Sequence, residues 1–183
     1  MYENYVELHF VGITHGREPE GVYVIVLQEP EGKRLYPVLT DEVGYNQLVA
    51  AIDRKDFTPT RLMVKLTKRL GFRLQGVRLL RPNNGRNMAM LDFRRGEEAV
   101  SISVTMAEAT LAALQAPCSF WVNREIFNVY VNIHPTPGAM TIPLHGMSNT
   151  LLRNALKAAV ETENFELASM LRDELKQREE NET

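Results

Sequence analysis

The chain has 183 residues, of which 44% are apolar and 24% are charged, and its formal net charge is −2. These values exclude a largely disordered protein, and the length allows one domain of ordinary size plus a small appendage. No apolar run approaches the roughly 18 residues that cross a membrane, the first residues predict no signal peptide, and the single cysteine, Cys118, excludes an internal disulfide. We therefore expect a cytoplasmic protein that does not contact a membrane.

The charge is unevenly distributed along the chain. Residues 54–95 hold twelve of the 21 lysines and arginines but only two acids, which gives this stretch a charge of +10 (12 minus 2). Residues 151–183 compensate with eight acids against five bases. Either an anionic partner or a solvated basic surface balanced by acids folded next to it explains this asymmetry.

Residues 5–53 predict three strands followed by a helix. Apolar and polar residues alternate from Val6 to Phe10, which is typical of a strand. The β-branched run at 22–28 predicts a buried strand, and RLYPVL at 34–39 follows a turn and predicts a third. Asp41 can cap the helix. The expected apolar positions of that helix are Val43, Leu48, Ala51 and Ile52.

Residues 60–70 predict a second helix, capped by Thr58 or Thr60 and ended by Gly71. Its leucines share one face and its bases share another, so we expect an amphipathic helix with a basic outer face. If the basic stretch binds nucleic acid, this face would contact the phosphates. The residues expected to do so are Arg61, Lys65, Lys68 and Arg69.

Residues 72–122 repeat the first pattern. Strands are expected at 72–80, 87–93 and 99–104, and a helix follows in which Thr105 and Glu108 form a capping box. A short strand, SFWV, comes next. The expected fold class is therefore α+β, with two β-β-β-α units that suggest an internal duplication, an intervening helix, and a C-terminal antiparallel α-hairpin.

The C-terminal hairpin is predicted from two apolar stripes in residues 151–178. The first stripe runs from Leu152 to Ala159 and the second from Phe165 to Leu175, and the residues TEN between them break the period. Such a small hairpin has little core, so we expect a second copy or another surface to cover it. The predicted boundaries are an α+β domain at 1–128, a linker at 129–149 that includes an edge strand, VYVNI, and the hairpin at 150–180.

Residues 152–175 resemble the UVR motif, because they read L-x-x-A-L-x-x-A-V-x-x-E-x-F-E-x-A-x-x-L-R-D-E-L. In that family the motif is a helical hairpin that mediates protein–protein contacts, often by pairing with another copy. The resemblance implies a protein partner or self-association into a homo-oligomer through the hairpin. The residues implied in the contact are Leu152, Leu156, Phe165, Leu171, Arg172 and Leu175.

Residues 5–128 are similar to the bifunctional nuclease domain family, whose members act on DNA and RNA. The similarity lies in GKRLYPV before a helix, TPTRL opening a helix that ends in LGF, and AEATLAAL before PCSFWV. Members of this family often carry a UVR tail in this position. The resemblance implies a cytoplasmic bacterial nuclease that uses Mg²⁺ or Mn²⁺.

The family's catalytic signature is eroded in this chain. Gly44 stands where the family has an acid in its first helix, although Glu42 lies nearby. The Arg-Pro…His-Asp stretch aligns to residues 58–63, where only Pro59 remains. The Asp-x-Arg-Pro-Ser-Asp-Ala signature aligns to residues 103–109, where a carboxylate, Glu108, and an alanine persist. The candidate catalytic residues are therefore Glu42 and Glu108, and Glu108 also has a structural explanation as a capping residue.

Two functions follow from these observations. In the first, the protein is a metal-dependent nuclease whose activity is weak or lost, with the basic helix steering the phosphate backbone. In the second, it is a non-catalytic adaptor or nucleic-acid-binding module that recruits a partner protein through the UVR hairpin. The four histidines show no metal-ligand spacing, so the sequence predicts no defined metal ligands.

Overall fold

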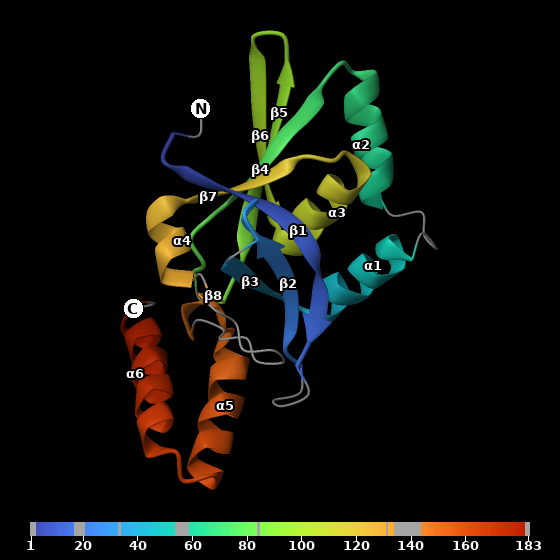
Figure 1. Cartoon of the computed structure of the whole chain (residues 1–183). Helices are drawn as coiled ribbons and strands as arrows, with labels where there is room; N and C mark the ends of the chain where they lie inside the picture. Colours follow the sequence, from blue (N-terminus) through green and yellow to red (C-terminus); the bar gives the residue numbers. More distant parts are fainter. Residues whose placement is uncertain are drawn as a thin grey trace.

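The computed structural model describes residues 3–16, 21–32, 34–53, 59–83, 85–130, 132–133 and 144–181. The fold is mixed α/β, with an eight-stranded sheet in the order β6-β5-β4-β7-β1-β2-β3-β8 (Figure 1). The elements in chain order are β1 (Tyr5–His15), β2 (Tyr23–Gln28), β3 (Arg34–Thr40), α1 (Glu42–Ile52), α2 (Pro59–Arg69), β4 (Arg73–Leu79), β5 (Met88–Arg95), β6 (Glu98–Thr105), α3 (Met106–Gln115), β7 (Ser119–Asn123), α4 (Arg124–Tyr130), β8 (Asn132–Ile133), the 3₁₀ helix η1 (Leu144–Gly146), α5 (Asn149–Glu161) and α6 (Phe165–Asn181).

The sheet consists of two antiparallel meanders that are joined through β7. Strands β1, β2 and β3 form one meander and β4, β5 and β6 form the other. Strand β7 pairs antiparallel with β1 and parallel with β4. Strand β1 pairs with β7 through its first half and with β2 through its second half, and its register shifts between Phe10 and Gly12. The long β1 therefore connects the two halves of the sheet.

Helix α3 is the central helix of the main core. Seven of its ten residues are buried, and it contacts both α1 and α2, which lie with it on one side of the sheet (Figure 1). Apolar residues of β2 to β5 and β7 join it in one continuous cluster. The capping box expected at its start is present, because the Thr105 side chain accepts from the Glu108 backbone N–H and Glu108 reaches back to Thr105.

Helix α4 was not expected from the sequence. It begins after Asn123, whose side-chain oxygen accepts a hydrogen bond from the Glu125 N–H at 2.9 Å. Phe127 and Tyr130 are buried one helical turn apart, and the Phe127 ring stacks on Tyr36 with centroids 5.9 Å apart. The expected strand VYVNI is wrong at Val129 and Tyr130, which belong to α4, whereas Asn132–Ile133 pair with β3. Val131 lies outside the described residues.

Two helices differ from the expected pattern of burial. In α1, Leu48 is buried and Ala51 packs against the core as expected, whereas Val43 and Ile52 are 65% and 44% exposed. In α2 the leucine face points to solvent, with Leu62 and Leu66 more than half exposed, and Val64 is the buried residue. Leu48 of α1 and Val64 of α2 belong to the main core cluster, and Ala51 and Met63 pack against it. Thr58, the alternative cap of α2, lies outside the described residues.

Helices α5 and α6 form the antiparallel C-terminal hairpin (Figure 1). Ser148 caps α5, with its hydroxyl oxygen 3.2 Å from the Leu151 N–H, and Asn164 likewise accepts from Leu167 at 3.2 Å. A separate apolar cluster fills the space between the two helices. Within the described ranges, no helix has the length and apolar character that crossing a membrane requires.

Candidate functional site

An open cleft of about 860 Å³ lies where the N-termini of α1, α3 and α5 meet. Its walls come from the end of β3, the loop before β5 and the starts of these three helices, which are distant in sequence. Polar and charged side chains from all of these segments line the cleft. They are Thr40, Asp41, Glu42, Gln47, Arg86, Asn87, Thr105, Glu108, Ser148, Thr150 and Asn154. This cleft is the candidate functional site, because a concave surface with several convergent polar groups is where ligands bind most often.

The helix starts in the cleft are satisfied by the protein's own side chains. Asp41 Oδ1 accepts from the Gly44 N–H at 2.7 Å. Glu108 Oε2 accepts from the backbone N–H of Thr105 at 2.8 Å and from its hydroxyl at 2.9 Å. These carboxylates satisfy the donors at the ends of α1 and α3 and complement the positive ends of the helix dipoles. Two of the three acids in the cleft therefore have structural roles.

The two predicted catalytic residues, Glu42 and Glu108, both line this cleft. Glu42 opens the first turn of α1 and is exposed, whereas Glu108 is held by the capping box of α3. Helices α1 and α3 thus place two acids that are distant in the sequence along the walls of one cleft. Within the described part of the chain, however, no three His, Cys, Asp or Glu residues are grouped so that they could hold a metal ion.

The site does not fit the divalent ion that the family resemblance implies. A magnesium or manganese site uses carboxylate oxygens that are free to coordinate. Here one oxygen of Asp41 and one of Glu108 accept hydrogen bonds from helix starts. Glu42 is the acid left in the cleft without such a bond. The acids of the cleft therefore support no catalytic step that uses a metal ion.

Gly44 occupies the position at which the family that this sequence resembles carries an acid. A Cβ atom added there would lie 2.6 Å from the Ala107 Cβ and 2.6 Å from the Thr40 hydroxyl oxygen. Real Cβ atoms do not approach other atoms this closely, so any side chain at this position would push α1 away from α3. An acid at this position, as the family resemblance implies, is therefore incompatible with the close packing of these two helices.

Sequence reasoning missed the loop before β5 as part of the site. The Asn87 side-chain amide donates to the Gly146 carbonyl at 3.2 Å. The backbone carbonyl of Asn87 accepts from the Met106 N–H at 3.0 Å. Gly85 has φ +75°, and a Cβ there would lie 2.4 Å from the Ser148 Cα. This loop therefore joins α3 to the start of the hairpin. The NNGRN sequence indicated only a turn.

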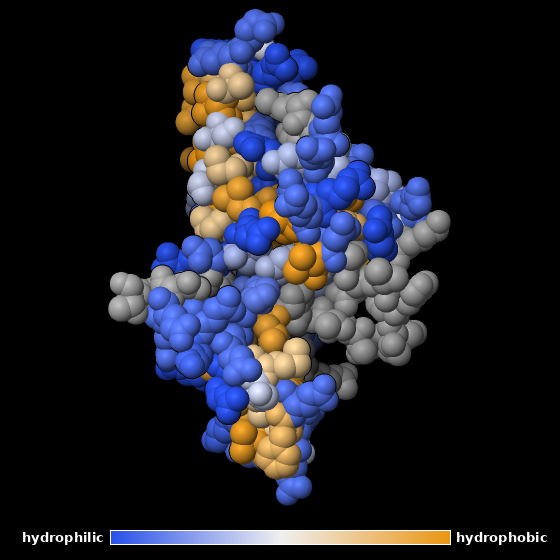
Figure 2. Space-filling model, turned by 90° about the vertical axis from the view of Figure 1, so that its left-hand side faces the viewer, coloured by the Kyte–Doolittle hydropathy of each residue, from blue (hydrophilic) through white to orange (hydrophobic). Residues whose placement is uncertain are grey.

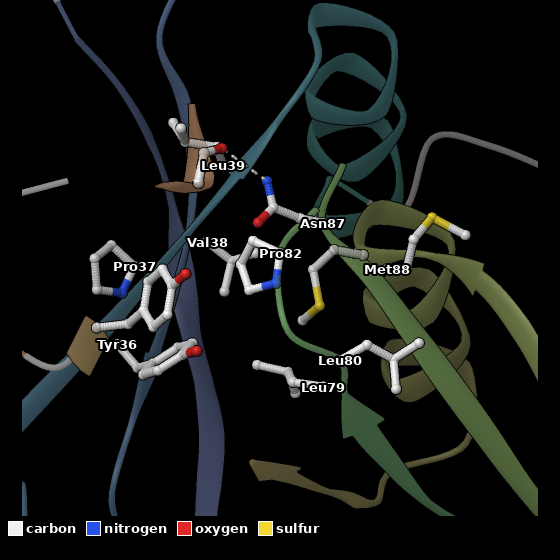
Figure 3. A pocket seen from close by; sticks show the side chains of 12 residues that line it. Tyr36, Pro37, Val38, Leu39, Leu79, Leu80, Pro82, Asn87 and Met88 are labelled. Atoms are coloured by element: carbon white, nitrogen blue, oxygen red, sulfur yellow. Dashed lines mark hydrogen bonds between the residues drawn. The ribbon is translucent and has the colours of Figure 1, made fainter. Parts of the chain in front are cut away.

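A small cavity lies beside the cleft, between β3 and the loop that joins β4 to β5 (Figure 3). Its volume of about 20 Å³ suits a single water molecule. Tyr36, Leu79 and Pro82 line it, and Asn87 and Met88 separate it from the cleft, because both residues line the two spaces. The cavity is too small for a substrate, so the cleft remains the candidate site.

The four predicted phosphate-contacting residues lie on the outer side of α2. Arg61, Lys65, Lys68 and Arg69 are all exposed. Leu62 and Leu66 of the same helix, and Leu70 directly after it, are 55%, 57% and 56% exposed. Helix α2 therefore presents two neighbouring surfaces to solvent, one basic and one apolar.

The six predicted partner-contacting residues divide into two groups. Leu152, Leu171 and Leu175 are buried inside the hairpin, at 0%, 1% and 9% exposure, so they hold the two helices together. Leu156 is partly buried in the same cluster. Phe165 and Arg172 are exposed, and Phe165 is 68% exposed. The surface that the hairpin offers to a partner is therefore narrower than the sequence indicated.

A buried ionic cluster, missed by sequence reasoning, ties α6 to η1 and the start of α5. Arg178 is 4% exposed and donates to Glu174 at 2.8 Å, to the Met147 carbonyl at 2.6 Å and to the Leu144 carbonyl at 2.9 Å. His145 Nδ1 lies 2.7 Å from Glu174. Burial raises the pKa of the Glu174 carboxyl, but hydrogen bonds from His145 and Arg178 outweigh it and hold the pKa below its ordinary value.

No protein-family model matches the sequence, and no curated protein matches it. The assignment of a function therefore rests on the residues of the chain and on their arrangement.

Proposed function

We propose that this protein is a divergent member of the bifunctional nuclease family that binds nucleic acid without cleaving it and recruits a protein partner through a UVR-type hairpin. The observation that carries the proposal is the state of the acids in the cleft. Asp41 and Glu108 cap the helices on which they lie, and Gly44 fills the place of the family's acid. In addition, no three possible metal ligands are grouped within the described residues, which favours binding over metal-dependent hydrolysis.

The proposed nucleic-acid contact is the basic face of α2. Four cations on one exposed helix face can lie against several phosphates at once, and such contacts release counterions from the nucleic acid. The neighbouring leucines offer an apolar surface next to these phosphate contacts. Because phosphate contacts carry no sequence information, we expect binding with little sequence preference.

The test compares two variants with the same change in net charge. In the first, Arg61, Lys65, Lys68 and Arg69 are all replaced by Glu. In the second, the same replacement is made at four exposed bases of the hairpin, Arg153, Lys157, Arg172 and Lys176. The first variant should lose binding to duplex and single-stranded nucleic acid, whereas the second should keep most of it. Equal losses would mean that net charge, not α2, determines binding.

A second candidate function is weak nuclease activity, and one observation favours it. Glu42 and Glu108 line the same open cleft, as a pair of acids in an active site would. The test is incubation of DNA and RNA with Mg²⁺ or Mn²⁺. Cleavage that disappears in both Glu42→Gln and Glu108→Gln would replace our proposal with an enzyme. Intact substrate in all samples would support binding without cleavage.

The partner of the hairpin is proposed to contact its exposed residues. Phe165 stands at the start of α6, and Met170 is 54% exposed on the same helix. These apolar side chains remain accessible after the hairpin has buried its own stripes. We therefore expect Phe165→Ala to weaken capture of a partner, whereas loss of Leu171 would act through unfolding of the hairpin.

We also infer that the two β-β-β-α units arose by duplication. Each unit is an antiparallel meander followed directly by a helix, and each helix starts in the cleft with a carboxylate at its cap or in its first turn. The two halves would then contribute equivalent positions, Asp41 and Thr105, to one site.

A further inference from the structure

Strand β6 forms one edge of the sheet. It pairs with β5 along its whole length, from Glu98 opposite Arg95 to Thr105 opposite Met88, and it is the terminal strand of the order given above. Seven of its eight residues are exposed. The backbone groups on the outer side of such a strand are a template on which another strand can pair.

This edge lacks the features by which proteins usually block such pairing. Residues 99–104 read AVSISV and contain no charge, no proline and no glycine. The pairing with β5 shows no register shift. Val100 and Ile102 are 40% and 39% exposed. The upper part of the molecule shows apolar surface along its left edge, beneath a hydrophilic tip (Figure 2). An open, regular, uncharged edge of this kind can accept a strand from another chain.

The sequence of the strand indicates what that partner is. The sequence from Val100 to Val104, VSISV, is the same when it is read in either direction. Two copies that pair antiparallel about a two-fold axis at Ile102 would place valine opposite valine and serine opposite serine. Ile102 would lie opposite itself. A contact that uses the same surface on both copies is the commonest arrangement in homo-oligomers.

The side chains of the strand are already oriented for such pairing. The Ser101 hydroxyl donates to Asp92 Oδ1 at 2.6 Å, and Asp92 also accepts from Arg78 at 2.8 Å. Val104 packs against the main core on the opposite face. Because side chains alternate along a strand, Val100 and Ile102 share the face of Val104. A dimer would therefore continue the core on one face and the row of serines on the other.

When two β6 strands pair about an axis at Ile102, no like charges lie opposite each other. Glu98, the nearest charged residue, would stand opposite Met106 of the other copy, beyond the paired segment. Its carboxylate already accepts from Arg95 at 2.7 Å. Apolar cross-strand pairs of this kind stabilise antiparallel sheets. We propose that two copies of this chain pair antiparallel through the β6 edge, with the two-fold axis at Ile102, and leave the hairpin free for another partner.

The first test uses the position that would face itself. Ile102→Lys alone and Ile102→Glu alone place like charges across the axis and should weaken the dimer at least about tenfold. An equimolar mixture of the two variants should restore a dimer, detected by light scattering. Val129→Lys, at an exposed position of α4, is the control and should leave the dimer unchanged. A dimer that survives both single variants would overturn the proposal, as would a wild-type chain that stays monomeric at every concentration.

The second test uses disulfide trapping and does not depend on charge. Ile102→Cys should crosslink with itself on mild oxidation, whereas Val100→Cys should crosslink mainly with Val104→Cys when the two are mixed. The native Cys118 should not interfere, because burial raises the pKa of its thiol to about 12. Equal crosslinking of all three variants on their own, or none in any mixture, would contradict an axis at Ile102.

Discussion

Helices α2 and α6 carry leucines at the same spacing, yet they use them in opposite ways. In α6, Leu171 and Leu175 are 1% and 9% exposed, and in α2, Leu62 and Leu66 are 55% and 57% exposed. Helix α6 follows α5 after a short turn, so an apolar stripe lies directly opposite its own. Helix α2 packs on α3 through its other side. Leucine spacing therefore identifies an apolar face but not what covers it.

The largest expected effect comes from one substitution made on both helices. Leu171→Glu places a charge in the hairpin cluster and should destabilise the hairpin by about 2–4 kcal/mol. Leu66→Glu changes an exposed side chain and should alter the free energy of unfolding by less than about 0.5 kcal/mol. Urea unfolding would measure both variants, with hydrogen exchange of the hairpin amides for Leu171→Glu and of the α2 amides for Leu66→Glu. Similar losses for the two variants would mean that α2 is covered in solution.

The packing of α1 on α3 should show the next largest effect. Gly44→Ala adds the Cβ that would lie 2.6 Å from Ala107 and should cost about 1–3 kcal/mol. Combining it with Ala107→Gly removes one of the two close contacts, so the pair should lose less stability than the sum of the single changes. Simple additivity in thermal or urea unfolding would show that the two residues do not interact.

Local signals in the sequence predicted most of the helices and strands, but they predicted fewer of the faces that these elements bury. The capping residues Asp41 and Thr105 mark helix starts that the structure confirms, because capping depends on neighbours in the chain. Helix α4 was missed because its burial depends on contacts of Phe127 with Tyr36, which is distant in sequence. The same limit applies to Asn87, whose role at the site depends on its hydrogen bond with the hairpin segment.

The two cleft acids Glu42 and Glu108 should contribute differently to the stability of the protein, by a smaller but measurable amount. Glu108→Ala removes the capping box of α3 and should cost about 0.3–1.5 kcal/mol. Glu42→Ala changes an exposed residue and should leave stability nearly unchanged. Thermal unfolding of both variants and of wild type would measure the difference. A loss for Glu42→Ala as large as that for Glu108→Ala would indicate that Glu42 also has a structural role.

The smallest expected effect is the response of the hairpin to acid. Because the pKa of Glu174 is lowered in the folded protein, its carboxylate contributes stability at pH values above the ordinary glutamate pKa of 4.5. That contribution is lost as the pH falls through the lower folded value. Hydrogen exchange of α6 amides should therefore speed up below about pH 4.5 relative to a Glu174→Gln variant. Identical profiles for the two proteins would exclude this linkage.

The most direct test of binding without cleavage is the salt dependence of nucleic-acid affinity, measured with Mn²⁺ present and with the recovered nucleic acid checked for breaks. We expect the logarithm of the binding constant for duplex to fall linearly with the logarithm of salt concentration, with a slope of about −0.9 for each phosphate contacted. The slope should become shallower when the α2 bases are replaced, and the duplex should stay intact. Absence of binding at low salt, or breaks that disappear in Glu42→Gln, would contradict the account.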